Sequence, residues 1–393
     1  MSQGLSIQQA PPFVIVFGFF LTAALFGVLG STLELYFSIE GTLNLPALVH
    51  LYTVGFALFT MFGALFQMLP VVAGAVIKNP KPKALASYLL LLSGFLLMLW
   101  GFLEGRSLLI GAFLTYLGIA YTSILMLWHL LRIKAYIPTP LGFKYALLFL
   151  LVGTSIGLYL VLSSWGYVPF WNKLFYFHLT FLLFGWVALL VASVSFRVVE
   201  MFFVTAAYPS GFAMNFPLLV LAGLSLSLFG GFFTLPLVFL YLAYSYMTLK
   251  RLIRRKRKRE PVIPFWYLSQ SFLIISLLLY PFLEKALLPF LFSFLVFFSS
   301  IIMGMMYRII PFLVWFHLSN MPAIKVPLMS EVISYDRIRL SFYLHSLWIV
   351  SLVVSYLTGL GFVFASLLHL MSSILFLYNI YTGSMLYFRL RRI

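Results

Sequence analysis

The chain is predicted to be an all-α membrane protein with twelve transmembrane helices. Hydrophobic residues make up 63% of its 393 positions and charged residues only 8%, and the mean hydropathy is +1.09. A helix needs about 20 apolar residues to cross a bilayer, and the sequence contains twelve such runs. Each run is expected to be a helix, because a bilayer offers no water to satisfy backbone groups.

The apolar runs give the bounds of each expected span. They are residues 12–33, 47–76, 84–103, 107–133, 142–163, 170–203, 213–230, 232–253, 263–282, 287–316, 338–358 and 361–387. Only the short break at Gly230-Gly231 separates the seventh span from the eighth. The alternative for residues 213–253 is one re-entrant segment, which would reverse the direction of every later helix. The basic C-terminal tail argues against that alternative.

A short pattern recurs near the ends of three spans, at Gly63–Pro70, Ser193–Glu200 and Gly304–Pro311. Each copy has a small residue, a polar side chain four positions later, and then two apolar residues before a Pro or Glu. The copies are offset by 130 and 111 residues, close to one third of the chain. We therefore expect a single polytopic membrane domain over residues 1–393. Its approximate repeats, residues 12–133, 142–253 and 263–387, are expected to form three pseudo-symmetric four-helix arcs.

We interpret the formal net charge of +17 as a signal for the orientation of the chain in the membrane. Most Lys and Arg residues fall in loops on one side of the twelve spans, so the positive-inside rule predicts that both termini are cytoplasmic. The expected location is the inner (cytoplasmic) membrane, with several passes. The basic run Lys250–Arg259 is interpreted as an anchor that contacts anionic lipid, and no nucleic-acid partner is expected.

The absence of cysteine limits the chemistry that the chain can perform. It excludes disulfides, thiolate-bound zinc, Cys-ligated iron–sulfur clusters and covalently attached c-type haem. The first dozen residues carry no Lys or Arg, so no cleavable signal peptide is expected.

Six histidines lie in or beside the spans: His50, His129, His178, His317, His345 and His369. Ionisable residues at membrane depth are rare and indicate function by default. A neutral imidazole with one hydrogen bond is also an ordinary packing residue, and both interpretations stay open for each position. The expected topology places His50, His178 and His369 in the outer half of the membrane. The other three lie toward the cytoplasmic face.

The repeat aligns the second span with the sixth. Gly55 and Gly185 each lie twelve residues before the polar residue of the pattern. In this register His50 corresponds to Thr180, so His50 and His178 are offset by two positions and point in different directions. They would approach one ligand from different sides or serve separate sites.

Two of these segments resemble helices of a known superfamily. Residues His50–Gly74 resemble the histidine-bearing second helix of the haem–copper oxidase catalytic subunit (subunit I) superfamily, especially its divergent, NnrS-like branch. Residues His178–Trp186 look like the sixth helix of that superfamily. The resemblance implies twelve helices in three arcs with cytoplasmic termini. It also implies haem b bound by His50, with His178 and His369 as partner ligands.

Three further positions are assigned to the expected cofactor site. Gly55 and Gly185 are included as the matched glycines of the two histidine-bearing helices. Arg197, three residues before Glu200, is included as a propionate clamp or a proton entry. Snorkelling of Arg197 to the interface is the alternative.

The chain departs from the superfamily where copper would bind. The tenth span has no histidine before His317, and the seventh has none over Asn215–Gly230. Copper is therefore not expected, and neither is respiratory oxygen reduction of the usual kind. The expected function is haem b binding in electron transfer, quinol chemistry or nitric oxide handling, with membrane oxidoreductase activity left open. Expected partners are the lipid bilayer, a quinone or redox protein, and a second copy of the chain.

The alternative function is a non-haem transporter or channel built on the same bundle. The repeats and the Pro residues near the span ends fit substrate passage. Few charged residues fall deep in the expected spans, so an ion-coupled mechanism lacks an obvious carrier.

Overall fold

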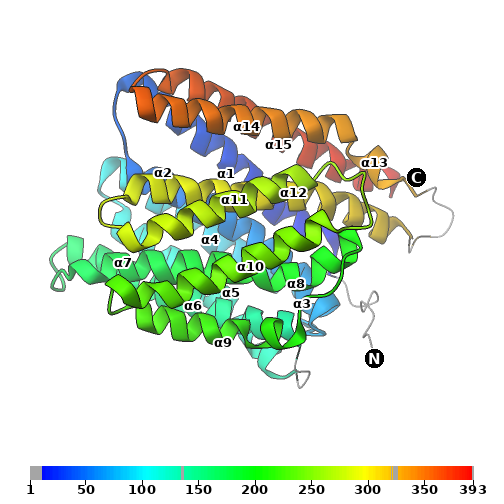
Figure 1. The fold of residues 1–393 in the computed structure, drawn as a ribbon, viewed down its shortest axis with the longest axis horizontal. Coiled ribbons are helices and arrows are strands. Elements are labelled where there is room, and N and C mark those ends of the chain that lie inside the picture. The colour runs from blue at the N-terminus through cyan, green and yellow to red at the C-terminus, as the bar shows by residue number, and fades with distance from the viewer. Residues whose placement is uncertain (1–10, 134–136, 320, 322–325, 392–393) are drawn as a thin grey trace. The chain divides into compact units, whose positions relative to one another are not determined.

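The computed structural model describes residues 11–133, 137–319, 321 and 326–391, and throughout these residues every regular element is helical (Figure 1). Lys134, Lys325 and Arg392 contributed to the predicted orientation and lie outside the described residues.

The prediction of twelve spans is confirmed, because twelve of the described helices are long and apolar enough to cross a membrane. They are α1 (Phe13–Glu40), α2–η2–α3 (Leu45–Val72), α4 (Pro80–Glu104), α5 (Leu108–Leu131), α6 (Pro138–Ser164), α7–η3–α8 (Asn172–Phe203), α9 (Ser210–Ser227), η4–α10 (Gly231–Ile253), α11–η5 (Ile263–Phe282), α12 (Leu287–Ser319), α14 (Tyr335–Thr358) and α15 (Phe362–Leu390). A short helix, α13 (Met329–Val332), precedes α14.

Two predicted boundaries can be compared with the structure. The break between the seventh and eighth spans is confirmed, since Gly230 and Gly231 have φ values of 71° and 54°, which other residues rarely adopt. The predicted end of the first span at residue 33 is wrong. Helix α1 continues to Glu40 and ends at Gly41, whose φ is 64°. The apolar run stops before Glu34, but the helix does not.

Two of the spans contain a π-helical segment. The second span consists of α2 (Leu45–His50), η2 (Leu51–Leu58) and α3 (Phe59–Val72), and η2 is the π-helix. The sixth span repeats this order with α7 (Asn172–Thr180), the π-helix η3 (Phe181–Ala188) and α8 (Leu189–Phe203). Hydrophobic periodicity predicted neither interruption, because both segments are apolar throughout.

The described residues pack into two compact units. Unit 1 includes Leu65–Glu260 and Ser269–Phe298. Unit 2 consists of Pro12–Ala64, Pro261–Leu268 and Ser299–Ile393. Helices α3, α11 and α12 each contribute residues to both units.

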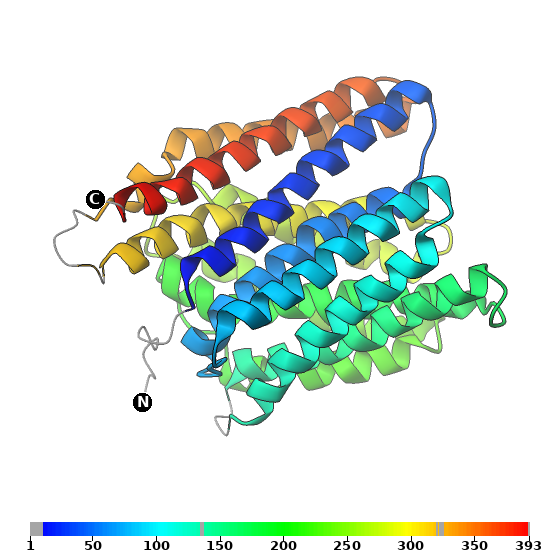
Figure 2. The same cartoon turned by 180° about the vertical axis from the view of Figure 1, so that it is seen from behind.

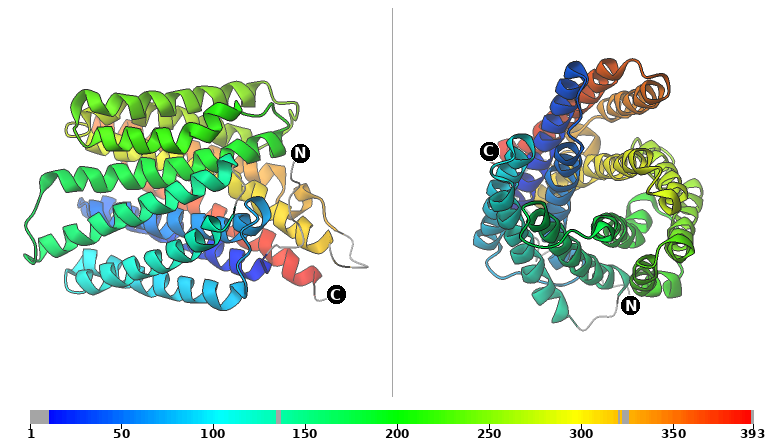
Figure 3. Two further views of the ribbon diagram at one scale, coloured as in Figure 1. Left: turned by 90° about the horizontal axis from the view of Figure 1, so that it is seen from below. Right: turned by 90° about the vertical axis from the view of Figure 1, so that its left-hand side faces the viewer.

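Helices α4 and α5 lie side by side within unit 1 (Figure 3), and glycines line their contact. Gly94 and Gly101 lie seven residues apart on α4, and Gly111 and Gly118 have the same spacing on α5. A Cβ atom on Gly111 would lie 2.1 Å from the backbone nitrogen of Met98. The two backbones therefore approach so closely that only glycine fits, as is typical of membrane helix pairs.

In unit 2, α15 packs along both α1 and α14 (Figure 2). Helix α1 also packs against η2, where the ring of Tyr52 fills the space beside Gly30. A Cβ atom on Gly30 would lie 2.8 Å from Tyr52 Cζ. The first and last helices of the chain are therefore neighbours in this unit, and η2 lies against the first of them.

Part of the basic run Lys250–Arg259 has a structural role. Arg251 lies 4.2 Å from the ring centroid of Tyr208 and donates a hydrogen bond to the Ala207 carbonyl. Arg257 forms an ion pair with the buried carboxylate of Glu260. Burial raises the pKa of Tyr208, so its hydroxyl stays protonated against Thr248. Other members of the run, such as Lys258, are exposed and remain suited to anionic lipid.

We predict that Gly111→Ala destabilises the protein by about 1–3 kcal/mol, because overpacking forces the backbones apart. Thermal unfolding of purified protein in detergent measures the effect. Gly18→Ala is the matched control, since a Cβ atom on this helical glycine would meet nothing within 4 Å. An equal melting temperature for both variants would show that the close approach of α4 and α5 contributes little.

Candidate functional site

His50 and His178, the predicted ligands in the second and sixth spans, each lie beside a π-helix. His50 is the last residue before η2, and His178 lies three residues before η3. Gly55 and Gly185 are the fifth residues of these two segments. The segments begin 130 residues apart, at Leu51 and Phe181, which is the spacing of the first two repeats. π-Helical turns are rare and often occur at functional sites.

The third expected repeat differs at this point. Counting twelve residues back from Arg308 gives Val296, which lies in continuous α-helix within α12 (Leu287–Ser319). The π-helical segments therefore occur in the two spans that carry a histidine close to the matched glycine. The corresponding part of α12, which has no histidine there, is regular α-helix.

The hydrogen bonds of His50 and His178 fix the tautomer of each ring. His50 Nδ1 lies 2.8 Å from the carbonyl oxygen of Pro46, and His178 Nδ1 lies 2.9 Å from that of Gly153. A carbonyl oxygen only accepts, so Nδ1 carries the proton in both rings. The lone pair of each neutral imidazole is then on Nε2. This is the arrangement that metal-binding histidines adopt when their other nitrogen donates to a carbonyl.

The Gly153-x-x-x-Gly157 motif in α6 is part of the His178 site. Gly153 supplies the carbonyl that orients the ring. Gly157 leaves room for it, because a Cβ atom there would lie 2.6 Å from His178 Cε1. The sequence predicted a close helix contact at this motif, and the structure adds that the contact holds an imidazole.

The other predicted site residues lie in ordinary surroundings. Gly185 packs tightly against Phe149, where a Cβ atom would come within 2.8 Å of Phe149 Cβ. Arg197 is half-buried on α8, and so is Glu200. His129 donates its Nδ1 proton to the Leu125 carbonyl at 2.8 Å. Among the described residues, no three His, Asp or Glu side chains gather into a metal-binding group.

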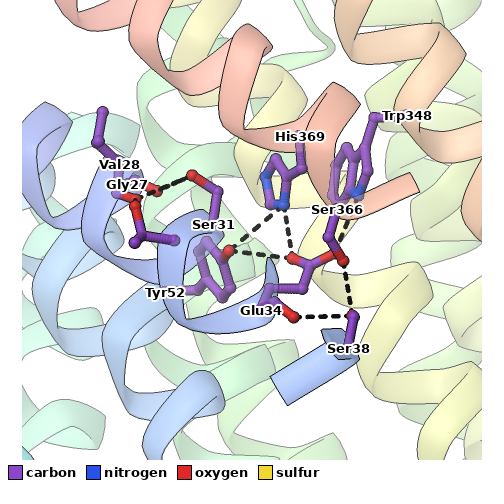
Figure 4. Close-up of polar contacts among 10 residues, drawn as sticks. Gly27, Val28, Ser31, Glu34, Ser38, Tyr52, Trp348, Ser366 and His369 are labelled. Atoms are coloured by element: carbon purple, nitrogen blue, oxygen red, sulfur yellow. Dashed lines mark hydrogen bonds and ion pairs between the residues drawn. The ribbon is translucent and has the colours of Figure 1, made fainter. Parts of the chain in front are cut away.

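His369, the third predicted ligand, belongs to a different site centred on Glu34 (Figure 4). His369 Nδ1 lies 2.7 Å from one carboxylate oxygen of Glu34. The Tyr52 hydroxyl lies 3.3 Å from the same oxygen and 3.4 Å from His369 Nδ1. The indole N–H of Trp348 donates to the other carboxylate oxygen at 3.4 Å, and the Ser366 hydroxyl donates to it at 3.5 Å. We call these five residues the Glu34 cluster.

The Glu34 cluster is buried and comes from four different elements. The side chains of Glu34 and His369 are 14% and 8% exposed. The His369 ring stacks on Trp348, with centroids 3.7 Å apart and planes 14° apart. Ser38, one turn after Glu34 on α1, hydrogen-bonds the Ser366 hydroxyl at 2.8 Å. Helices α14 and α15 and the segment η2 therefore supply the partners of a single carboxylate on α1.

Glu34 was not among the predicted site residues, because the first span was predicted to end at residue 33. A hydropathy window treats an acid at the end of an apolar run as the start of a loop. A local signal was present, since Gly30, Ser31, Glu34 and Ser38 follow one another at helical spacing on α1. Small and polar residues in this pattern predict a helix face that packs against protein instead of lipid.

Two further polar clusters lie in unit 2. The Ser300 hydroxyl and His345 Nε2 are hydrogen-bonded at 2.9 Å. The Tyr307 hydroxyl donates to Ser341 Oγ at 2.7 Å and accepts from Asn379 Nδ2 at 3.3 Å. All five side chains are buried.

Comparison with known proteins does not assign the chain to a family. A scan of the sequence against protein-family models finds no match, and a search of curated proteins finds no relative.

We predict that Glu34→Ala destabilises the protein by about 3–5 kcal/mol, because removing one partner of a buried pair leaves the other without compensation. Glu34→Gln is expected to cost less, since the amide oxygen still accepts hydrogen bonds. Thermal unfolding in detergent measures both variants. The matched control is Glu40→Ala, which removes an exposed acid from the same helix. A Glu34→Ala variant as stable as the control would contradict the role given to the pair.

Proposed function

We propose that the protein binds haem b in a cytoplasmic (inner) membrane and acts in electron transfer, quinol chemistry or nitric oxide handling. The observation that carries the proposal is the tautomer of His50 and His178. Each imidazole sits within a membrane span with its Nδ1 proton on a backbone carbonyl and its lone pair on Nε2. Neutral imidazoles oriented in this way suit axial ligation of a haem iron.

In this proposal His50 and His178 are each a candidate ligand that would bind a haem iron, and each lies beside its own π-helical segment. Gly55 and Gly185, the matched glycines of those segments, remain candidate site residues, and Arg197 is the candidate partner for a propionate. When bound, the haem would supply one-electron redox chemistry. His369 is not assigned to iron, because its Nδ1 is in contact with the Glu34 carboxylate and its ring is stacked on Trp348. Copper has no part in the proposal.

The proposal includes the finer architecture expected from the sequence. The twelve helices would form three four-helix arcs related to the haem–copper oxidase superfamily, in particular to its NnrS-like branch, with both termini cytoplasmic. Partners would be a quinone or a redox protein, and a second copy of the chain. The 130-residue spacing of η2 and η3 supports a relation between the first two repeats.

We predict that protein purified from haem-supplied cells shows a Soret band and a sharp α-band after reduction with dithionite. His50→Ala is expected to abolish the band and His178→Ala to abolish or shift it, because each removes a ligand. His129→Ala is the matched control, since His129 makes the same i to i−4 carbonyl hydrogen bond but does not adjoin a π-helix. The haem-to-protein ratio gives the number of haems. A colourless protein, or an unchanged spectrum in His50→Ala, would contradict the proposal.

The alternative, a non-haem transporter, gains support from one observation. The Glu34 cluster places an acid within a predicted membrane-spanning helix, and carboxylates at this depth are common in proton-coupled carriers. A colourless protein that carries a solute in a Glu34-dependent manner would favour this function over haem binding.

A further inference from the structure

One side of α15 carries a line of buried polar residues. At 3.6 residues per turn they occupy less than half of the helix circumference. The first and last are 18 positions apart, which corresponds to about 27 Å along the helix axis and is close to the thickness of the hydrocarbon core. They are Ser366, His369, Ser372, Asn379 and Ser384, each at most 6% exposed.

The three polar clusters of unit 2 follow this line. Near the start of α15, His369 belongs to the Glu34 cluster, and its ring stacks on Trp348. Trp348 lies 5.3 Å from the ring of His345, one turn earlier on α14. His345 is hydrogen-bonded to Ser300 of α12. The Trp348 ring therefore lies between the first cluster and the second, in contact with an imidazole of each.

The third cluster lies one further step along the same helices. Ser341 precedes His345 by one turn of α14, and Tyr307 follows Ser300 by two turns of α12. The Tyr307 hydroxyl joins Ser341 to Asn379 of α15. Toward the end of α15, the ring of Tyr387 lies 5.9 Å from that of His317. Ionisable side chains therefore occur at both ends of the polar line.

Several buried polar atoms along this line lack a hydrogen-bond partner in the part of the chain that the structure describes. Ser372 Oγ, Asn379 Oδ1, Ser384 Oγ and His317 Nε2 are buried and have no hydrogen-bond partner among the described residues. Leaving such an atom unsatisfied destabilises the folded protein. Buried polar groups of this kind are ordinarily satisfied by internal water. Proton paths in membrane proteins consist of hydroxyl groups, imidazoles and water molecules in a line.

We propose that unit 2 contains a proton path along α15, in which the Glu34–His369 pair binds and releases the proton. With one proton between them, the two side chains are neutral overall. A second proton converts the pair to a carboxylic acid beside an imidazolium, and loss of one proton to the next acceptor restores it. The ionisable groups that face the pair are Tyr52 from η2 and, beyond Trp348, His345 from α14. A proton path in unit 2 does not require haem.

Proton flux into liposomes tests the path. Purified protein is reconstituted into vesicles loaded with a pH-sensitive dye, and a potassium gradient with valinomycin imposes a membrane potential. The wild-type protein is expected to carry protons well above the rate of protein-free vesicles. Glu34→Gln and Asn379→Leu are each expected to lower this flux by at least about tenfold. The first removes the carboxylate that binds the proton, and the second removes the amide that hydrogen-bonds the Tyr307 hydroxyl. Wild-type flux no greater than that of empty vesicles would overturn the proposal.

Matched controls separate a lost path from a lost fold. Glu40→Gln removes an exposed acid from α1, and Asn215→Leu removes an exposed amide from α9, so both should conduct like the wild type. Glu34→Asp keeps a carboxylate and should recover part of the flux that Glu34→Gln loses. Each variant is first checked for a single peak in gel filtration and for its melting temperature. Unchanged flux in well-folded Glu34→Gln and Asn379→Leu would overturn the path.

A second readout follows the proton on Glu34 directly. Infrared difference spectra between acidic and alkaline pH are expected to contain the carbonyl stretch of a protonated carboxyl group. This band should shift in heavy water, disappear in Glu34→Gln and persist in Glu40→Gln. A spectrum that Glu34→Gln leaves unchanged would show that the Glu34 carboxyl does not exchange a proton. Haem content enters neither measurement, so a colourless protein would reject the haem proposal and leave the proton path untouched.

Discussion

The contact between the Glu34 carboxylate and the His369 imidazole is the interaction on which the interior of unit 2 depends. A lone carboxylate within an apolar helix is costly, and it persists only when other groups neutralise and hydrogen-bond it. Glu34 receives an imidazole, an indole N–H and two hydroxyl groups as neighbours. Because these partners come from three other elements, their placement ties the first helix of the chain to its last two helices and to η2.

The histidines illustrate how one residue type is put to different uses in an apolar protein. His50 and His178 each donate a hydrogen bond from Nδ1 to a backbone carbonyl, which leaves the lone pair on Nε2. His369 contacts a carboxylate and His345 contacts a hydroxyl, so both belong to networks that can exchange protons. His129 makes the same carbonyl hydrogen bond, so the adjoining π-helix, together with the partner of the ring, separates the histidines proposed as metal ligands from the others.

Most of the fold could be predicted from the sequence, because a chain that is 63% hydrophobic and 8% charged has few ways to satisfy its backbone in lipid. The break between the seventh and eighth spans at Gly230 and Gly231 could also be predicted from the sequence. The extension of α1 beyond residue 33 was not, since the cost of Glu34 is offset by His369, 335 positions away in the chain. The π-helices were not predictable either, because Leu51–Leu58 and Phe181–Ala188 are as apolar as the regular helices around them. Candidate ligands could be listed from the sequence, but their tautomers depend on which carbonyl each ring meets.

Solid-state NMR of the protein in lipid bilayers, labelled with ¹³C-glutamate and ¹⁵N-histidine, tests the central contact most directly. We expect a correlation between a glutamate carboxyl carbon and a histidine Nδ1 across one hydrogen bond, and we expect this correlation to be lost in both Glu34→Gln and His369→Gln. Absence of that correlation in the wild-type protein would contradict the Glu34–His369 contact, because Glu34 would then lie in the membrane without the imidazole that offsets the cost of its burial.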